Sequence, residues 1–436
     1  MTDTYERPTR GQLPERRPPS LRALRADFGW QYVGAGATGV LFSATGPVAV
    51  IMGAAAAGAL TAVQTASWVF GVFVLNGILT VVASWVYRMP LSFFWTIPGT
   101  VLVGQSLASL TWPEVVGAYL ATGVLVIVLG VTGVVTRLMA FLPQSVVMAM
   151  VAGAFLSFGT GLVHSVSTNA IVAGAMVVAW LALTRSATWS TRIPPVLAAL
   201  AAGLVALAVT GGFTRMSGPA AELPLIGLPE LVAPAFSGAA MAQLVIPLAI
   251  TVVAVQNGQG AAVLNSAGHR PPMTVVTIAC GIWSLLAAPL GAVSTCLAGP
   301  TNALLAAVGA RSRQYIAGMT CGAIAVVVGL SAPLLVRSLS VVPATFIAAL
   351  AGLAMLEPLR GAFTAAFSDS VGRPVLAPLV TLLVTISGTD VGGLGAPFWG
   401  LVAGVGVTYL LDRRRSPTVP SVHERERSAP ATPVRR

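Results

Sequence analysis

The chain has 436 residues, of which 56% are hydrophobic and only 8% are charged, and its mean hydropathy is +0.86. Ordinary soluble domains are about one quarter charged, so this chain cannot cover a body folded in water and must be solvated by lipid. The composition also excludes a disordered protein, a coiled coil and a disulfide-stapled secreted domain. Cys280, Cys296 and Cys321 lie in apolar runs and are expected to be small core residues.

The net charge of +11 comes from arginine alone, because the sequence has no lysine. Of the 24 arginines, 13 lie in two polar tails at 1–27 and 412–436. The Pro, Ser and Thr content of the tails predicts disorder, and their charge favours anionic lipid headgroups over nucleic acid as a partner.

Between Val33 and Leu411 the sequence is nearly continuously apolar, broken by short polar or proline-containing stretches. At roughly 27 residues per span with its loop, this length predicts an all-α polytopic membrane protein with about 14 spans. The spans are expected near 34–57, 62–87, 91–108, 113–136, 143–163, 167–184, 193–210, 241–263, 273–293, 294–308, 314–336, 342–357, 374–388 and 393–411.

The arginines predict the orientation, since cytoplasmic loops retain positive charge. With both tails inside, 22 of the 24 arginines are cytoplasmic, and only Arg215 and Arg337 are outside. The chain is therefore expected in the cytoplasmic membrane with both termini in the cytoplasm.

An internal repeat follows at an offset of about 200 residues. The segment 130–156 resembles 329–356, with Arg137 matching Arg337 and Pro143 matching Pro343. An odd number of spans per repeat inverts the second copy, and inverted repeats are typical of alternating-access transporters. We expect repeats at 28–211 and 241–411, joined by an extracellular segment at 212–240.

The same offset relates two short segments, 91–103 and 294–306. Each begins with β-tolerant residues, reaches Pro98 or Pro300 and continues as a helix, which predicts a short strand followed by a half-helix. Two half-helices entering from opposite faces would point two N-termini at the membrane midplane. Their free N–H groups and positive dipole ends would form an anion site.

At these residues the chain resembles the benzoate:proton symporter family, which is related to the uracil permease and sulfate transporter fold. The resemblance rests on FFWTIPG at 93–99, VQNGQGAAVLNSAGHRPP at 255–272 and GPTNALLA at 299–306, and it extends over about 28–411. It implies a core domain of spans 1–4 and 8–11, a gate domain of spans 5–7 and 12–14, and import of benzoate or a similar aromatic carboxylate with protons. The substrate residues that it implies are Ser43, Thr45, Thr96, Pro98, Gly99, Thr100, Gln256, Asn257, Gly258, Pro300, Thr301 and Asn302.

One departure from the family's nucleobase-transporting relatives concerns charge. Those relatives use acidic residues in spans 8 and 10, where this chain has Gln256, Asn257, Thr301 and Asn302. A neutral polar site suits an anion, because a buried carboxylate beside benzoate would repel it. The aromatic residues at 93–95 could pack on a substrate ring or serve as ordinary core.

Glu357 is the one carboxylate near the interior of an apolar span, and it precedes Pro358. Two hypotheses for proton coupling stay open: Glu357 takes up the proton, or the substrate is protonated between the half-helices.

His164 and His269 are expected in solvated loops on opposite sides, so we expect no metal site. The glycines at 34, 36 and 39 favour close helix packing over dinucleotide binding.

An enzyme is not expected, because the spans carry no paired acids, Ser/Lys pair or metal triad, and no cofactor is expected. The alternatives are a nucleobase or inorganic-anion transporter of the same fold and, less favoured by the broken helices, a channel. A homodimer is possible.

Overall fold

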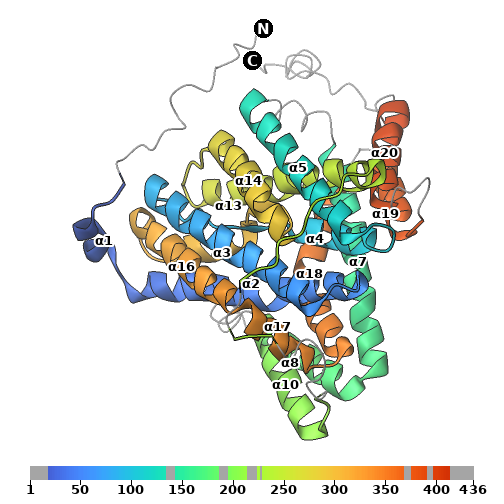
Figure 1. The fold of residues 1–436 in the computed structure, drawn as a ribbon, viewed down its shortest axis with the longest axis horizontal. Helices are drawn as coiled ribbons and strands as arrows, with labels where there is room; N and C mark the ends of the chain where they lie inside the picture. Colours follow the sequence, from blue (N-terminus) through green and yellow to red (C-terminus); the bar gives the residue numbers. More distant parts are fainter. Residues whose placement is uncertain are drawn as a thin grey trace, which may run out of the picture.

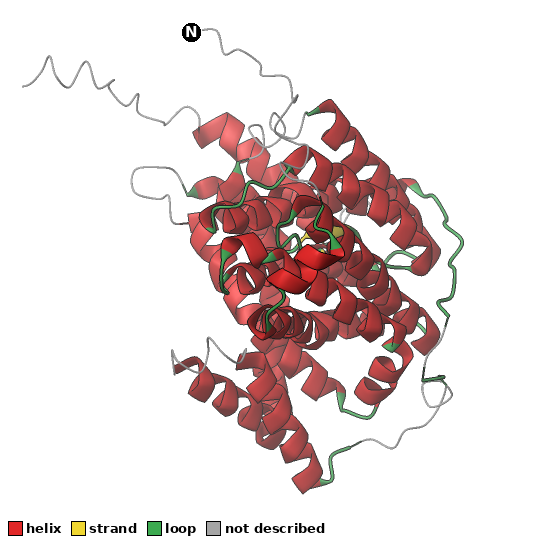
Figure 2. Ribbon diagram, turned by 90° about the vertical axis from the view of Figure 1, so that its left-hand side faces the viewer, coloured by secondary structure: helices red, strands yellow, loops and turns green. Residues whose placement is uncertain are grey.

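The computed structural model describes residues 18–133, 143–185, 195–213, 223–225, 228–367, 375–389 and 396–412. The described chain is a bundle of helices around one short two-stranded sheet, which lies inside the bundle (Figure 2). Arg137, Arg215 and most of the tail arginines used to predict the orientation and the repeat lie outside the described residues.

The elements of the first half alternate long helices with one broken segment. They are α1 (Leu21–Asp27), α2 (Trp30–Ala57), α3 (Ala62–Tyr87), β1 (Phe93–Trp95), α4 (Ile97–Ser106), α5 (Trp112–Thr132), α7 (Gln144–Thr168), α8 (Ala170–Arg185) and α10 (Pro195–Thr210).

The second half contains a second broken segment and several changes of helix type. Its elements are α11 (Gly238–Ala240), the π-helix η1 (Met241–Val245), α12 (Ile246–Ile250), the π-helix η2 (Thr251–Asn257), α13 (Gly258–Ser266), α14 (Met273–Ala287), the 3₁₀-helix η3 (Ala288–Leu290), β2 (Thr295–Leu297), α15 (Gly299–Ala306), the 3₁₀-helix η4 (Arg311–Arg313), α16 (Tyr315–Leu330), α17 (Ala332–Ser340), α18 (Ala344–Phe367), α19 (Leu376–Ile386), α20 (Ala396–Val407) and the π-helix η5 (Thr408–Asp412).

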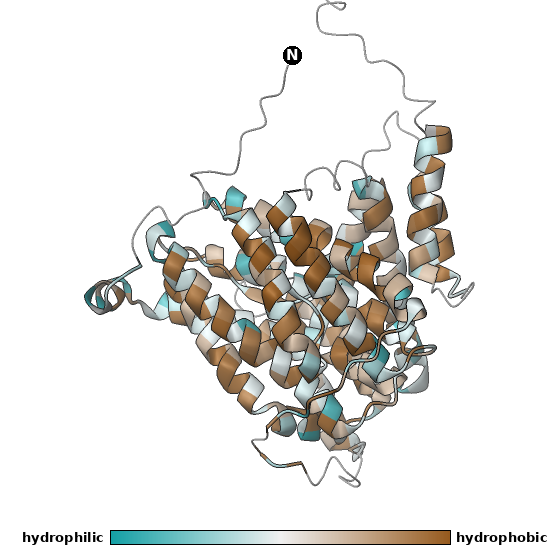
Figure 3. Ribbon diagram, turned by 45° about the horizontal axis from the view of Figure 1, so that its top comes forward, coloured by the Kyte–Doolittle hydropathy of each residue, from teal (hydrophilic) through white to brown (hydrophobic). Residues whose placement is uncertain are grey.

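Eight helical segments among the described residues are long and apolar enough to cross a membrane, and four shorter apolar helices accompany them. Hydrophobic residues cover the helices along most of their length (Figure 3). Each predicted span coincides with a helix or with a strand and half-helix, although α8, α10, α19 and α20 are short. The chain is therefore a polytopic membrane protein.

The prediction of disorder is wrong for the last residues of the N-terminal tail. Ser20 accepts a hydrogen bond from the backbone N–H of Ala23 and begins α1. At the end of this helix, Asp27 accepts a hydrogen bond from the Tyr315 hydroxyl at 2.7 Å and forms an ion pair with Arg88 at 3.2 Å. The contacts of Asp27 attach α1 to the bundle, where it projects from one side (Figure 1).

The long helices pack in two groups. In the first, α16 packs against α3 and α2, and α14 packs against α5. In the second, α7 packs against α18 and α19, α19 packs against α20, and α8 packs against α10. Contacts between α2 and α18 join the groups (Figure 1).

Paired glycines allow two very close crossings in the first group. A Cβ on Gly77 of α3 would lie 2.7 Å from the carbonyl oxygen of Gly322 in α16, and Gly123 of α5 and Gly281 of α14 face each other similarly. Gly36 of α2 approaches the α16 backbone as closely, and a Cβ on Gly39 would lie 3.0 Å from Thr301, in agreement with the packing role expected for them. The same expectation is wrong for Gly34, where a Cβ would have no neighbour within 4 Å. The predicted repeat makes α3 equivalent to α14 and α5 to α16, so it would interchange the first two crossings.

Candidate anion-binding site

The two strands lie at the centre of the site and form an antiparallel pair. Phe93 pairs with Leu297, and Trp95 pairs with Thr295. All six strand residues are buried. Each strand leads directly into a half-helix, so α4 and α15 begin at opposite ends of the small sheet. The predicted strand and half-helix arrangement is confirmed.

Two asparagines expected to bind substrate instead hold backbone groups beside the strands. The side-chain oxygen of Asn302 accepts from the Ser92 N–H at 2.9 Å, and its NH₂ group donates to the Ser92 carbonyl oxygen at 3.3 Å. The side-chain oxygen of Asn257 accepts from the Leu297 N–H at 2.8 Å. Neither asparagine lines the cavities described below, and the side-chain oxygen of each accepts from a backbone N–H in or beside a strand.

The N-terminus of α4 is capped by its own chain. Thr96 Oγ1 accepts from the Gly99 N–H at 3.1 Å and donates to Thr251 Oγ1 at 3.0 Å, while Thr100 Oγ1 donates to the Thr96 carbonyl oxygen. These contacts leave the first turn of α4 with fewer free donors. The two half-helix N-termini, which we expect to form one anion site together, therefore differ in how many free donors they offer.

The N-terminus of α15 is not capped by a side chain. Its N-cap residue is Ala298, which has no side-chain acceptor. Pro300 in the first turn has no N–H, but the N–H groups of Gly299 and Thr301 belong to a turn without intrahelical acceptors. The positive end of the α15 dipole adds to these donors, so α15 is the better anion site of the two.

Gln256 and Asn257 lie in the π-helix η2. Pro247, in the first turn of α12, has no N–H for the i→i−4 pattern, and wider π-turns lie on both sides of α12. Wide turns of this kind are frequent at functional sites. The side chain of Asn257 reaches β2, whereas Gln256 lines the cavity wall.

A cavity of about 970 Å³ lies between the two groups of helices, with α2, α4, η2, α13 and α15 on one side and α7, α8, α10 and α18 on the other. Apolar side chains form most of its wall. Residues of its wall that bear on ligand chemistry are Phe42, Pro98, Gln144, Phe155, Trp180, Thr184, Gln256, Gly258, Gln259, Gly299, Pro300 and Glu357.

A narrow cleft of about 20 Å³ adjoins the cavity, shares Gln256 and Pro300 with it, and reaches Ser43 and Thr301. The Ser43 and Thr301 hydroxyls lie 3.5 Å apart. Trp95 also lines the cleft, and its buried Nε1 has no hydrogen-bond partner among the described residues.

Seven of the predicted residues are thus brought together around the cavity and cleft, and six are not. Those in the walls are Ser43, Pro98, Gln256, Gly258, Pro300, Thr301 and Glu357. Those outside the walls are Thr45, Thr96, Gly99, Thr100, Asn257 and Asn302. Thr45, for example, donates its hydroxyl to the carbonyl oxygens of Leu41 and Phe42 in its own helix.

Glu357 is ion-paired and mostly exposed. Its Oε2 lies 2.6 Å from Nη2 of Arg360, one turn further along α18, and 58% of the Glu357 side chain is exposed. Its negative charge is therefore balanced beside the cavity.

These features describe a neutral, partly aromatic cavity with an anion site at one end. A sequence model of the family described as "Benzoate membrane transport protein" matches residues 26–410, nearly the whole described chain. The chain belongs to the benzoate membrane transport protein family. It is therefore a membrane transporter, which is not an enzyme class.

Two relatives of this benzoate-family chain match it over most of their length. The "Inner membrane protein YdcO" of Escherichia coli (strain K12) is 30% identical over 383 residues, which are 86% of this chain and 94% of that protein. The "Benzoate membrane transport protein" of Acinetobacter baylyi is 28% identical over 397 residues, which are 90% of this chain and 98% of that protein.

Solved structures with the same fold include transporters of anions. The transmembrane domain of the cyanobacterium bicarbonate transporter BicA matches with a TM-score of 0.57 and 15% identity, covering 89% of this chain and 99% of that one. The overall structure of SLC26A9 matches with a TM-score of 0.58 and 15% identity, covering 91% and 72%. At this identity the likeness shows the fold alone.

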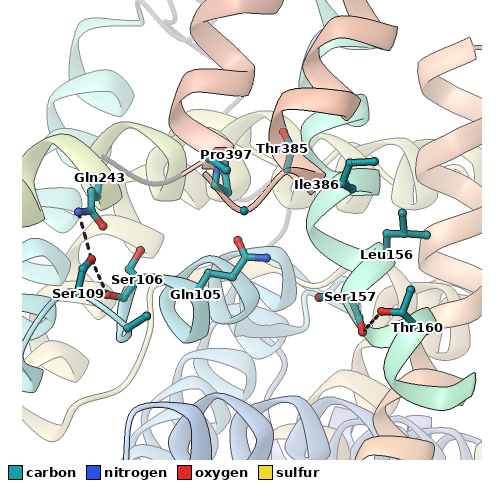
Figure 4. A pocket seen from close by; sticks show the side chains of 14 residues that line it. Gln105, Ser106, Ser109, Leu156, Ser157, Thr160, Gln243, Thr385, Ile386 and Pro397 are labelled. Atoms are coloured by element: carbon teal, nitrogen blue, oxygen red, sulfur yellow. Dashed lines mark hydrogen bonds between the residues drawn. The ribbon is translucent and has the colours of Figure 1, made fainter. Parts of the chain in front are cut away.

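The protein has a second pocket, of about 460 Å³, at the C-terminal end of α4 (Figure 4). Hydroxyl and amide groups line it, from Gln105, Ser106, Ser109, Ser157, Thr160 and Gln243. A helix C-terminus carries negative partial charge, which disfavours a carboxylate there. The larger cavity, at the N-termini of α4 and α15, is thus the candidate site.

Sequence reasoning missed Gln259, Gln144, Phe155 and Trp180 in the wall of this cavity. Gln259 could have been found, because it follows Gln256 by three residues and shares a helix face with it. The others come from the second group of helices, and no motif in the sequence relates them to the half-helices.

His269 is buried, contrary to the expectation of a solvated loop residue. Its Nε2 lies 2.7 Å from Oε1 of Gln314, whose NH₂ group donates to the carbonyl oxygens of Ala306 and Val308. Burial lowers the pKa of His269, and nearby Arg311 lowers it further, against the opposite effect of the Gln314 hydrogen bond. His269 thus connects the loop after α13 to the end of α15. Among the described residues, no group of three or more possible metal ligands occurs.

Proposed function

We propose that this chain imports benzoate or a similar aromatic monocarboxylate together with protons by alternating access. The observation that carries the proposal is the uncapped N-terminus of α15, which opens beside the Gln256 amide onto a largely apolar cavity. This end of α15 offers donors and positive partial charge to a carboxylate, while the cavity offers apolar surface to a ring.

The dimensions suggest how the substrate lies. The cleft of about 20 Å³ next to Pro300 and Thr301 is too small for an aromatic ring, so only the carboxylate end can approach it. The ring then stays in the larger cavity, where Phe42 is an aromatic neighbour. A nucleobase lacks the carboxylate and an inorganic anion lacks the ring, so each would use only half of this site.

We further propose 14 crossings in two inverted repeats of seven, with both termini cytoplasmic. The interchange of the Gly77–Gly322 and Gly123–Gly281 crossings supports the inversion. The two groups of helices correspond to the core and gate domains, and because the cavity lies between them, a movement of one group against the other would change access to it.

We place the coupling proton on the substrate and not on Glu357. The Glu357 carboxylate would have to break its contact with Arg360 to take up a proton, and 58% of its side chain is exposed instead of enclosed in the cavity wall. The cavity wall contains no other carboxylate among the described residues.

A thermal-shift screen of the purified protein tests the substrate class. Benzoate and substituted benzoates should raise the unfolding temperature, whereas uracil, xanthine and sulfate should not. A ligand at one hundred times its Kd stabilises the folded state by about 2.7 kcal/mol, which is a measurable shift. Stabilisation by sulfate or uracil but not by benzoate would contradict the proposal.

A further inference from the structure

Gln259 lies directly against the uncapped end of α15. A Cβ placed on Gly299 would come within 2.6 Å of Gln259 Cγ and within 2.8 Å of its Oε1, so the Gln259 side chain occupies the space that a Cβ at residue 299 would need. Gln259 is exposed to the cavity, and no hydrogen bond joins its amide to another described residue.

Two further polar groups point to a ligand at this end of α15. Gln256 is 95% buried, lines both the cavity and the cleft, and makes no side-chain hydrogen bond with the described residues. Trp95, in the cleft wall, is 2% exposed, and its Nε1 has no partner among the described residues. Buried polar groups normally have partners, so unpartnered groups in the wall of the cleft that reaches Pro300 and Thr301 indicate a site for a ligand.

We propose that Gln259 is a specificity-determining residue that covers the N-terminus of α15 in the empty carrier and donates its amide to the carboxylate of the bound substrate. In the empty carrier its Oε1 lies near the helix end, where an acceptor is favoured. Rotation of the amide would present the NH₂ group to an arriving carboxylate. Gln259 then favours an acid over a neutral molecule of the same shape. This inference rests on the proposed function.

The test compares benzoate Kd values of purified variants, measured by isothermal titration between pH 5.5 and 7.5. Gln259→Glu places a carboxylate over α15, where it competes with the substrate, so Kd at pH 7.5 should rise at least a hundredfold. Binding should then require one additional proton. As the pH is lowered, the Kd of this variant should therefore fall about tenfold per pH unit relative to wild type. Gln259→Met keeps the length and loses the donor, and its Kd should rise about tenfold without the added pH dependence.

Gln105→Glu is the matched control. It introduces the same chemical change in the second pocket, at the opposite end of α4. Its Kd for benzoate should stay within twofold of wild type. If wild type binds benzoate and Gln259→Glu binds it equally well, or more weakly with no added pH dependence, the role of Gln259 is wrong while the proposed function stands. If wild type does not bind benzoate or its analogues, the proposed function itself fails.

Discussion

The side-chain amides in the middle of the protein have two different environments, although they look alike in the sequence. A buried amide needs a partner, but the sequence does not say whether the partner is a ligand or the backbone. Asn257 and Asn302 bond to backbone groups beside the strands, whereas Gln256 faces the cavity. Their roles depend on contacts between segments far apart in the chain, which no local pattern encodes.

Asn302→Leu should therefore reduce stability and not ligand contact. The change leaves the N–H group of Ser92 unpaired in a buried position, at a cost of about 1–3 kcal/mol, while the Ser92 carbonyl oxygen keeps its hydrogen bond from the Ala298 N–H. The unfolding temperature in detergent should therefore fall. The temperature rise on adding benzoate should persist in this variant. Asn265→Leu, at an exposed position of α13, is the control. An unchanged unfolding temperature with loss of the benzoate effect would instead make Asn302 a direct ligand residue.

Glu357→Gln tests the position of the coupling proton. Because Glu357 is exposed and paired with Arg360, its neutral replacement should leave pH-driven accumulation of benzoate in proteoliposomes within about twofold of wild type. If accumulation is lost while counterflow exchange persists, the side chain carries the proton and our assignment to the substrate is wrong.

His269 should make stability depend on pH. Its pKa in the folded protein lies below the ordinary value of 6.5, so the unfolded chain binds the proton more readily. Stability is therefore complete above about pH 6.5 and declines as the pH falls below it. The decline in unfolding temperature between pH 7 and pH 5 should be smaller in His269→Gln than in wild type. His164→Gln, at an exposed site, should keep the wild-type decline, and equal declines in all three proteins would exclude this role of His269.

At the scale of the elements, the two strand and half-helix segments could be predicted from the sequence. The difference in N-terminal capping between α4 and α15 could not. Pro98 and Pro300 stand at matching offsets after β-tolerant residues, which suffices to predict both strands and both half-helices. The difference in capping depends on Thr96 against Ala298, one residue in each copy. The π-helices around Pro247 were missed because hydropathy in a fully apolar span carries no periodic signal.

The paired glycines make a prediction about helix packing. Gly322→Ala would place a methyl group 2.5 Å from the carbonyl oxygen of Gly77, and separating α3 from α16 should cost about 1–3 kcal/mol. Gly174→Ala in α8, where nothing lies within 4 Å, should be neutral or slightly stabilising. Thermal unfolding of both variants tests this prediction. If Gly322→Ala and Gly174→Ala unfold at the same temperature, the crossing of α3 and α16 tolerates separation.

At the scale of the whole molecule, composition alone required a lipid-solvated body, and the apolar ranges located nearly every helix of the bundle. What the sequence could not provide is the cavity. Its walls combine α2, α4, α13 and α15 with α7, α8, α10 and α18, and such combinations arise only when the two halves of the chain pack together. Only that arrangement places the apolar wall and the N-terminus of α15 where one ligand can contact both.

The most direct test of the central claim is uptake of labelled benzoate by proteoliposomes under an inside-alkaline pH gradient. Protein-free liposomes measure the neutral acid that crosses lipid unaided, and this rate is subtracted. We predict a protein-dependent rate that saturates with benzoate, exceeds the rate without a gradient several-fold and collapses on addition of a protonophore. Proton-coupled transport of an aromatic carboxylate would be contradicted by a protein-dependent rate that changes with neither the gradient nor the protonophore. The absence of any protein-dependent uptake would also contradict it.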